Sequence, residues 1–131
     1  MIDKTKGKKA MHNFRKLLVY QKSIKFTSTA RKVIRKFPKE EMFALSSQFR
    51  RATDSIALNI AEGSGNESTK ETAKFLGYSI RSAYECLCCL DIAVENDYLL
   101  PSDSRLVENF VDELIKMLVA LQKTISKRSN I

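Results

Sequence analysis

Four segments of the chain repeat apolar residues at intervals of three and four, and this period constrains the fold more than any other feature. That spacing gathers apolar side chains on one face of an α-helix, and no segment alternates convincingly as a strand would. Only 4 Gly and 2 Pro are available for turns. The sequence therefore predicts an all-α protein built from a few long helices. The clearest repeats are Met42, Leu45, Phe49, Ala52, Ile56, Ile60 and Leu76, Ile80, Ala83, Leu87, Leu90, Val94.

Capping and breaking residues set the expected helix limits. The first helix covers about residues 13–36, because Pro38 cannot continue it. The second follows Pro38 and ends near Glu62, with Gly63 as a left-handed terminating residue. The third begins near Ser68 because "STKE" has the pattern of a capping box, in which Ser68 and Glu71 satisfy free backbone N–H groups. The fourth begins after Pro101 with Ser102 or Asp103 as its cap, and its apolar stripe is Val107, Phe110, Val111, Leu114, Leu118, Leu121 and Ile125.

Helices of this length with short connections favour an antiparallel up-and-down four-helix bundle. We expect one domain at residues 13–126, a disordered basic tail at 1–12 and a flexible C-terminal tail at 127–131. The first helix has a wide apolar arc, and the third carries a second strip of small residues: Ser79, Ser82, Cys86, Cys89 and Ala93. This apolar surplus predicts a second buried surface and therefore self-association.

Positive charge is concentrated at the start of the chain. Residues 1–39 hold thirteen Lys or Arg and one acid, whereas the remaining residues hold ten basic and fourteen acidic side chains. Such asymmetry favours a polyanionic partner, RNA or DNA before an anionic membrane; solubility with a basic tail is the alternative. The expected phosphate contacts are Lys22, Lys25, Lys32 and Lys36 on the first helix, the tail residues Lys4, Lys6, Lys8 and Lys9, and also Arg50 and Arg51. Arg50 and Asp54 are alternatively read as a surface i,i+4 ion pair.

The stretch "NIAEGSGNESTKE" at residues 59–71 contains glycines and a lysine but does not fit a phosphate-binding loop. Its spacing departs from G-x-x-x-x-G-K-[ST], and a helical repeat precedes it where a dinucleotide fingerprint needs a strand. We interpret it as a connection between two helices. Asn59 and Glu62 are expected to hold the following loop by hydrogen bonds, with a ligand role as the alternative.

No arrangement typical of an enzyme or a metal site is found. Cys86, Cys88 and Cys89 are three clustered thiols in a helical segment, and the single histidine, His12, lies far from them. A zinc site needs four ligands at suitable spacing, and a catalytic triad needs a histidine within the fold. We therefore expect buried, unreactive thiols, no cofactor, no metal and no catalytic residue. The chain has neither an apolar run long enough for a membrane span nor a secretory signal, so a cytoplasmic location is expected.

Three stretches resemble one known family. "NFRKLLVYQKS" at 13–23, "FPKEEMFALSSQFRRATDSIALNIAEG" at 37–63 and "STKETAKFLGYSIRSAYECL" at 68–87 are similar to the bacterial 23S rRNA intervening-sequence protein family, also called the four-helix bundle protein family. The family commonly has proline and alanine where this chain has Ala57 and Leu58, so we expect a weaker kink here. The resemblance implies a homopentameric ring without catalytic activity. A distant relative, the accessory variability protein of diversity-generating retroelements, implies contact with nucleic acid and a reverse transcriptase.

These observations support two hypotheses about function. The first is a non-enzymatic homo-oligomer that presents the basic first helix and tail to RNA or DNA. The second is a protein–protein scaffold whose basic face docks an acidic partner such as a polymerase or reverse transcriptase.

Overall fold

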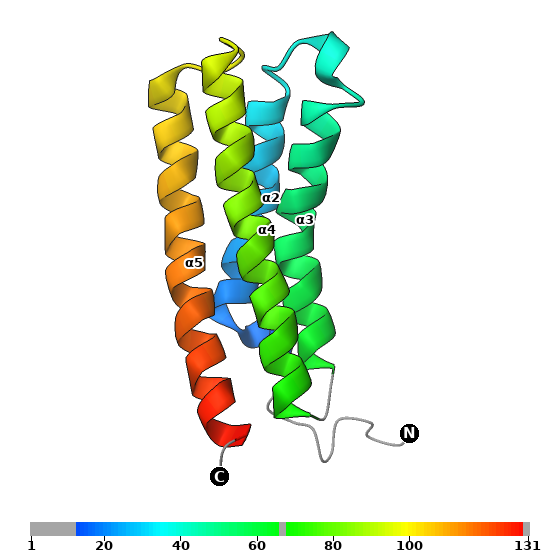
Figure 1. Ribbon diagram of the computed structural model, residues 1–131, viewed down its shortest axis with the longest axis vertical. Coiled ribbons are helices and arrows are strands. Elements are labelled where there is room, and N and C mark those ends of the chain that lie inside the picture. The colour runs from blue at the N-terminus through cyan, green and yellow to red at the C-terminus, as the bar shows by residue number, and fades with distance from the viewer. Residues whose placement is uncertain (1–12, 66–67, 130–131) are drawn as a thin grey trace.

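The computed structural model describes residues 13–65 and 68–129, and within them four long helices form an up-and-down bundle (Figure 1). Neighbouring helices along the chain run antiparallel. The described residues contain no strand, so the predicted all-α fold with four helices is confirmed. The helices are α2 Leu18–Ile34, α3 Leu45–Ser64, α4 Thr69–Glu95 and α5 Pro101–Ser129, and the 3-10 turns η1 Phe14–Lys16 and η2 Lys39–Glu41 precede α2 and α3.

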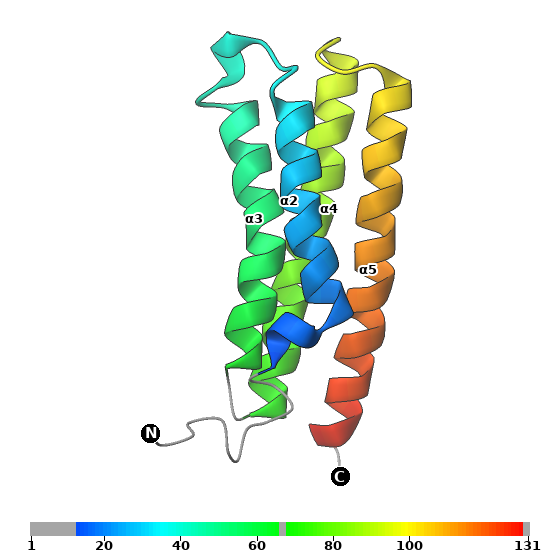
Figure 2. The same cartoon turned by 180° about the vertical axis from the view of Figure 1, so that it is seen from behind.

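The helices pack in the order α2, α3, α4, α5 and back to α2, so that α2 lies diagonally across from α4 (Figure 2). The start of α2, the α3–α4 connection and the end of α5 share one end of the bundle, which we call the lower end from its place in Figure 1. The α2–α3 and α4–α5 connections share the upper end. Residues distant in sequence are thereby gathered at two opposite ends.

The predicted apolar repeats form the core. Phe49, Ile56 and Ile60 of α3 are fully buried. Other repeat positions are only partly buried and pack against this core: Ile80, Leu87, Val94, Phe110 and Leu121. Phe26 of α2 meets Phe110 of α5 edge to face, with ring centroids 5.2 Å apart. Burying side chains of this size stabilises the fold by about 1.5–3 kcal/mol each. Met42 is an exception, because it precedes α3 and is 47% exposed.

The first helix is shorter than predicted. Residues 14–16 form η1, and the extended backbone of Leu17 (ψ 127°) separates this turn from α2. The side chain of Gln21 donates a hydrogen bond to the Arg15 carbonyl at 2.9 Å, and Phe14 packs edge to face on Tyr20. These contacts hold η1 against α2, so the turn does not continue as part of that helix.

The second helix also begins later than predicted. After Pro38 the chain forms η2, and α3 begins only at Leu45. The Glu41 carboxylate accepts a hydrogen bond from the Leu45 backbone N–H at 3.3 Å, so it satisfies one of the free N–H groups at that helix start. Phe43 in this connection is 93% exposed.

Gly63 does not end the helix in a left-handed conformation, so that prediction is wrong. Gly63 lies inside α3, and Gly65 is the C-cap with φ −78°. A Cβ added at Gly63 would lie 2.8 Å from the Cβ of Phe75 on α4. The glycine is therefore required by the close approach of α3 and α4, and not by a turn.

The small-residue strip of α4 is used within the bundle. Ser79 donates a hydrogen bond to the Ile56 carbonyl at 2.9 Å, and the hydroxyl of Thr53 lies 3.6 Å from the sulfur of Cys86. The strip therefore lets α4 approach α3 closely. It provides no surplus surface for self-association, which corrects that part of the prediction.

The start of α4 is as predicted, whereas both ends of α5 differ. Ser68 is the N-cap of α4 and accepts a hydrogen bond from the Glu71 backbone N–H at 3.3 Å. Helix α5 begins at Pro101 itself, upstream of the predicted caps, and proline suits a first helical position because its missing N–H has no partner to lose there. It extends to Ser129, so residues 127–129 of the predicted tail are helical. The predicted tail at 1–12 lies outside the described residues.

Candidate nucleic-acid interface

Two of the four lysines predicted on the first helix, Lys22 of α2 and Lys36 just after its end, are engaged in ion pairs with α5. Lys22 contacts the Glu113 carboxylate, and Lys36 lies 3.1 Å from that of Asp103. These contacts tie α2 to α5 and reduce the positive potential that the two lysines offer to a polyanion. Lys25 and Lys32 are exposed, and neither has an acidic partner among residues 13–65 and 68–129.

Arg50 and Arg51 are exposed on α3, as a contact role requires. Arg51 donates to the side chain of Gln48, which in turn contacts Glu85 of α4. Arg51 is thereby linked to α4 through Gln48.

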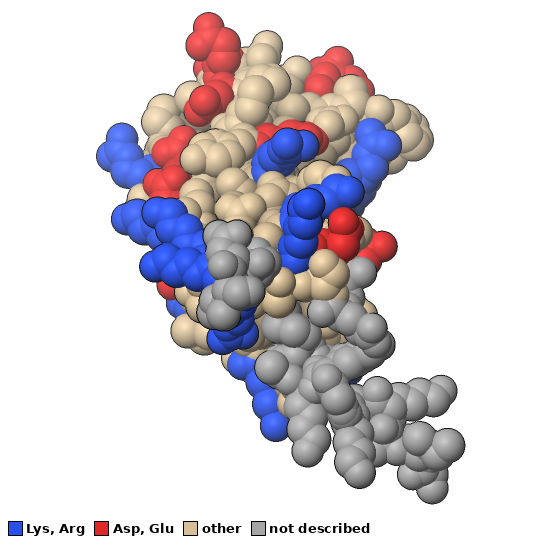
Figure 3. Space-filling model, turned by 60° about the horizontal axis from the view of Figure 1, so that its bottom comes forward, with Lys and Arg blue, Asp and Glu red and all other residues tan. Residues whose placement is uncertain are grey.

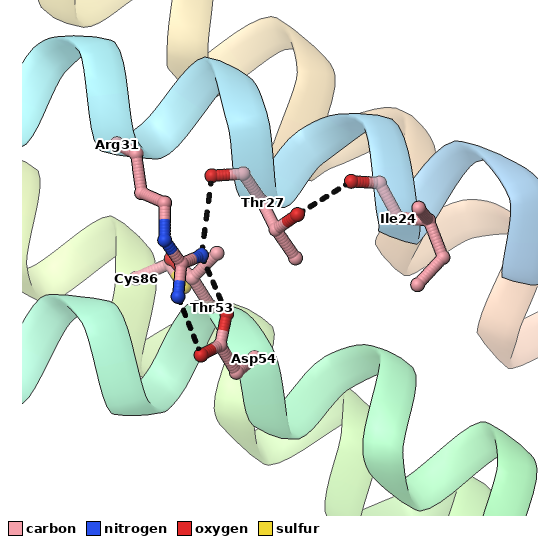
Figure 4. Close-up of polar contacts among 6 residues, drawn as sticks. All are labelled: Ile24, Thr27, Arg31, Thr53, Asp54 and Cys86. Carbon is pink, nitrogen blue, oxygen red and sulfur yellow. Dashed lines mark hydrogen bonds and ion pairs between the residues drawn. The ribbon is translucent and has the colours of Figure 1, made fainter.

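Asp54 pairs with Arg31 of α2, and the predicted Arg50–Asp54 pair is wrong. The terminal nitrogens Nη1 and Nη2 of Arg31 donate to the two Asp54 carboxylate oxygens at 2.7 and 2.8 Å (Figure 4). These hydrogen bonds raise the pKa of Arg31, so the guanidinium stays charged. The pair joins α2 to α3, and spacing within one helix gave no sign of it because the partner comes from another helix.

A stronger charge pattern runs along the bundle axis. The lower halves of the helices, residues 13–26, 55–65, 68–82 and 115–129, hold eleven Lys or Arg and two Asp or Glu. The upper halves, residues 27–54 and 83–114, hold eight Lys or Arg and eleven Asp or Glu. With the lower end turned forward, Lys and Arg gather around the near end and most Asp and Glu lie toward the far edge (Figure 3).

Seven exposed cations at this lower end form a group that we call the basic end. Two belong to η1, two to the start of α4 and three to the end of α5: Arg15, Lys16, Lys70, Lys74, Lys123, Lys127 and Arg128. Lys127 and Arg128 suit a helix C-terminus, but Lys70 lies in the first turn of α4, where the helix dipole disfavours a cation. Helix stability alone does not explain why these charges gather. Sequence reasoning missed the group because only the up-and-down topology brings its members together.

Thr72, which sequence reasoning did not single out, joins the two helices at the α3–α4 connection. Asn59 donates a hydrogen bond to the Ser55 carbonyl of its own helix at 2.8 Å. Thr72 instead bridges the two helices, since its hydroxyl lies 2.9 Å from the Gly63 carbonyl and 3.1 Å from that of Ser68. The loop residues 66–67 lie outside the described residues.

The three cysteines differ in exposure. Cys86 and Cys89 are buried as expected, whereas Cys88 is exposed, which corrects the prediction for that residue. Burial raises the pKa of Cys86 to about 12 and that of Cys89 to about 11, so both thiols remain protonated near neutral pH. No group of three or more potential metal ligands occurs in the part of the chain that the structure describes. Among the same residues, no helix is long and apolar enough to cross a membrane.

Two comparisons with known proteins give matches. A family model described as 23S rRNA-intervening sequence protein matches residues 15–120. A crystal structure of a protein of unknown function from the S23 ribosomal protein family of Bacteroides thetaiotaomicron superposes with a TM-score of 0.75. The two chains are 22% identical, and the match covers 81% of this chain and 99% of the other, which establishes similarity of fold. No curated protein matches the chain.

Proposed function

The chain belongs to the 23S rRNA-intervening sequence protein family, and from this premise we propose that it is a self-associating, non-enzymatic protein that binds RNA or DNA. The main support is the basic end. Seven exposed cations occupy one end of the bundle, and the lower half that contains them has an excess of nine positive charges. A concentrated positive field of this kind attracts a polyanion and raises its association rate.

The proposal moves the centre of the interface away from α2. Lys22 and Lys36 would have to exchange their carboxylate partners for phosphates. Among residues 13–65 and 68–129, the ion pairs of the basic end are limited to that of Lys74 with Glu71, at 4.0 Å. Lys25 lies in the same half and can extend the surface, and Arg50 and Arg51 lie in the acidic half.

Recognition through such a surface depends on phosphate charge and not on base sequence. Lysine and arginine side chains that neutralise phosphates release condensed counterions, so affinity falls steeply as salt rises. If four to six of the seven cations reach phosphates, the slope of log K against log salt for duplex DNA is about −3.6 to −5.4.

Fluorescence anisotropy of labelled duplex DNA and single-stranded RNA, titrated with the full chain at several salt concentrations, tests this function. The proposal requires binding at low salt with a slope in that range and little dependence on sequence. Absence of binding at low salt, or affinity that does not change with salt, would refute it. A pull-down with and without nuclease addresses the scaffold alternative, since an acidic protein partner stays bound after nuclease treatment.

A further inference from the structure

A second surface feature lies between α2 and α3, and it extends from the middle of the bundle into the upper half. A groove of about 480 Å³ runs between the two helices and is lined by apolar and basic side chains. Ile24 and Leu58 line it with 44% and 63% of their surface exposed, and the buried Ala57 lies between α2 and α3. Large apolar side chains exposed beside a groove are typical of a surface that another molecule covers.

The groove carries net positive charge. Arg31, Lys32 and Arg35 line it together with a single acid, Asp54. Asp54 is already bound to Arg31 by two hydrogen bonds, which also fix the wall between α2 and α3. Lys32 and Arg35 have no acidic partner among the described residues, so the groove favours an occupant that is both apolar and acidic.

The opposite side of the bundle has such a surface. A smaller groove of about 210 Å³ between α4 and α5 is lined by Asp91, Glu95 and Glu108 and by one cation, Arg105. Two apolar residues also line this groove: Val94 of α4, which is half-buried, and Pro101 at the start of α5, which is exposed. Because the helices pack in the order α2, α3, α4, α5, the α2–α3 and α4–α5 sides face away from each other.

We propose that the α2–α3 groove receives the acidic α4–α5 surface of a second copy of this chain. This inference rests on the self-association proposed above and names the surfaces that would form it. The argument is charge complementarity: the α2–α3 lining has three cations and one acid, whereas the α4–α5 lining has three acids and one cation. Both linings also include apolar residues, Ile24 and Leu58 on the first and Val94 and Pro101 on the second. Each copy uses a different face toward each of two neighbours, so the interface is head-to-tail and builds a closed ring or a filament.

Charge reversal on each face tests the proposal. We expect Arg35→Glu and Glu95→Arg each to reduce the assembled mass of the wild-type chain to the monomer mass of 14.9 kDa, measured by light scattering. Arg50→Glu is the matched control, because Arg50 is exposed on α3 and outside the groove lining, and it should leave the mass unchanged. Lys32→Glu replaces Arg35→Glu if circular dichroism shows that the latter does not fold.

Mixing the two single variants is the decisive step. The Arg35→Glu copy retains its acidic face and the Glu95→Arg copy retains its groove, so a 1:1 mixture should form at least a dimer although neither variant does so alone. A mixture that remains monomeric overturns the head-to-tail arrangement. If both variants keep the wild-type mass, the inference is wrong while self-association stands. A monomeric wild-type chain contradicts self-association itself and the inference with it.

Discussion

Substituting Gly63 with alanine measures how tightly α3 and α4 pack at the connection that identifies the family. The added Cβ would lie 2.8 Å from the Cβ of Phe75 and 3.4 Å from the Thr72 carbonyl oxygen. Carbon atoms pack favourably at about 3.5–4.0 Å, so the helices must separate by roughly 1 Å. The Cβ of Phe75 is fixed to the backbone and cannot rotate away.

Two effects compete in this substitution. Overpacking a dense contact costs about 1–3 kcal/mol. Alanine is favoured over glycine in a helix interior by about 1 kcal/mol, and by less near a helix end. We therefore expect Gly63→Ala to lower the free energy of unfolding by about 1–2 kcal/mol, which for a chain of this size corresponds to a Tm lower by roughly 3–10 °C.

Urea unfolding followed by circular dichroism measures this change as a lower midpoint at unchanged slope. Gly65→Ala is the control, because its added Cβ would lie 3.5 Å from the Glu62 carbonyl oxygen and its φ of −78° suits any residue. We expect the control to change stability by less than about 0.5 kcal/mol. A Gly63→Ala protein as stable as the wild type would show that α3 and α4 do not approach as closely as described.

Three further predictions concern single contacts. Ser68→Ala removes the N-cap acceptor of α4 and should lower the free energy of unfolding by about 1 kcal/mol, measured by urea unfolding. An unchanged free energy of unfolding would mean that the cap does not form in solution. A double-mutant cycle of Arg31→Ala and Asp54→Ala should give a coupling energy of at most about 1 kcal/mol, because both side chains are more than a third exposed; additive effects would exclude the pair. A thiol reagent at pH 8 should modify Cys88 rapidly and the other two cysteines only on unfolding, since burial shields those thiols and raises their pKa; three equal rates would contradict this.

The sequence predicted the helices because its apolar period is a local property. Phe49, Ile56 and Ile60 recur at a spacing that only a helix brings to one face, and Ser68 lies three residues before Glu71 as a cap requires. The break at Leu17 has no local signal, because contacts of Phe14 and Gln21 with α2 stabilise it.

The candidate site was harder to predict because it depends on topology. The partner of Asp54 comes from α2, and Arg50, four residues before it, offered an equally plausible pair by spacing. Lys70 and Lys127 are 57 positions apart in sequence and share one end only because α4 and α5 run antiparallel. The position of Gly63 after a helical repeat predicted a helix end. The structure shows instead that a glycine is needed there because Phe75 of α4 lies so close.

The most direct test of nucleic-acid binding at the basic end compares two variants with the same change of charge. One replaces four basic-end residues by glutamine: Lys70, Lys74, Lys127 and Arg128. The other replaces four cations of the upper half: Lys39, Arg50, Arg51 and Arg105. Anisotropy titrations of duplex DNA across salt should show that the first loses up to about 3.6 from the magnitude of the slope while the second keeps the wild-type slope. Equal losses in both variants, or no loss in the first, would contradict the assignment of the interface to the basic end.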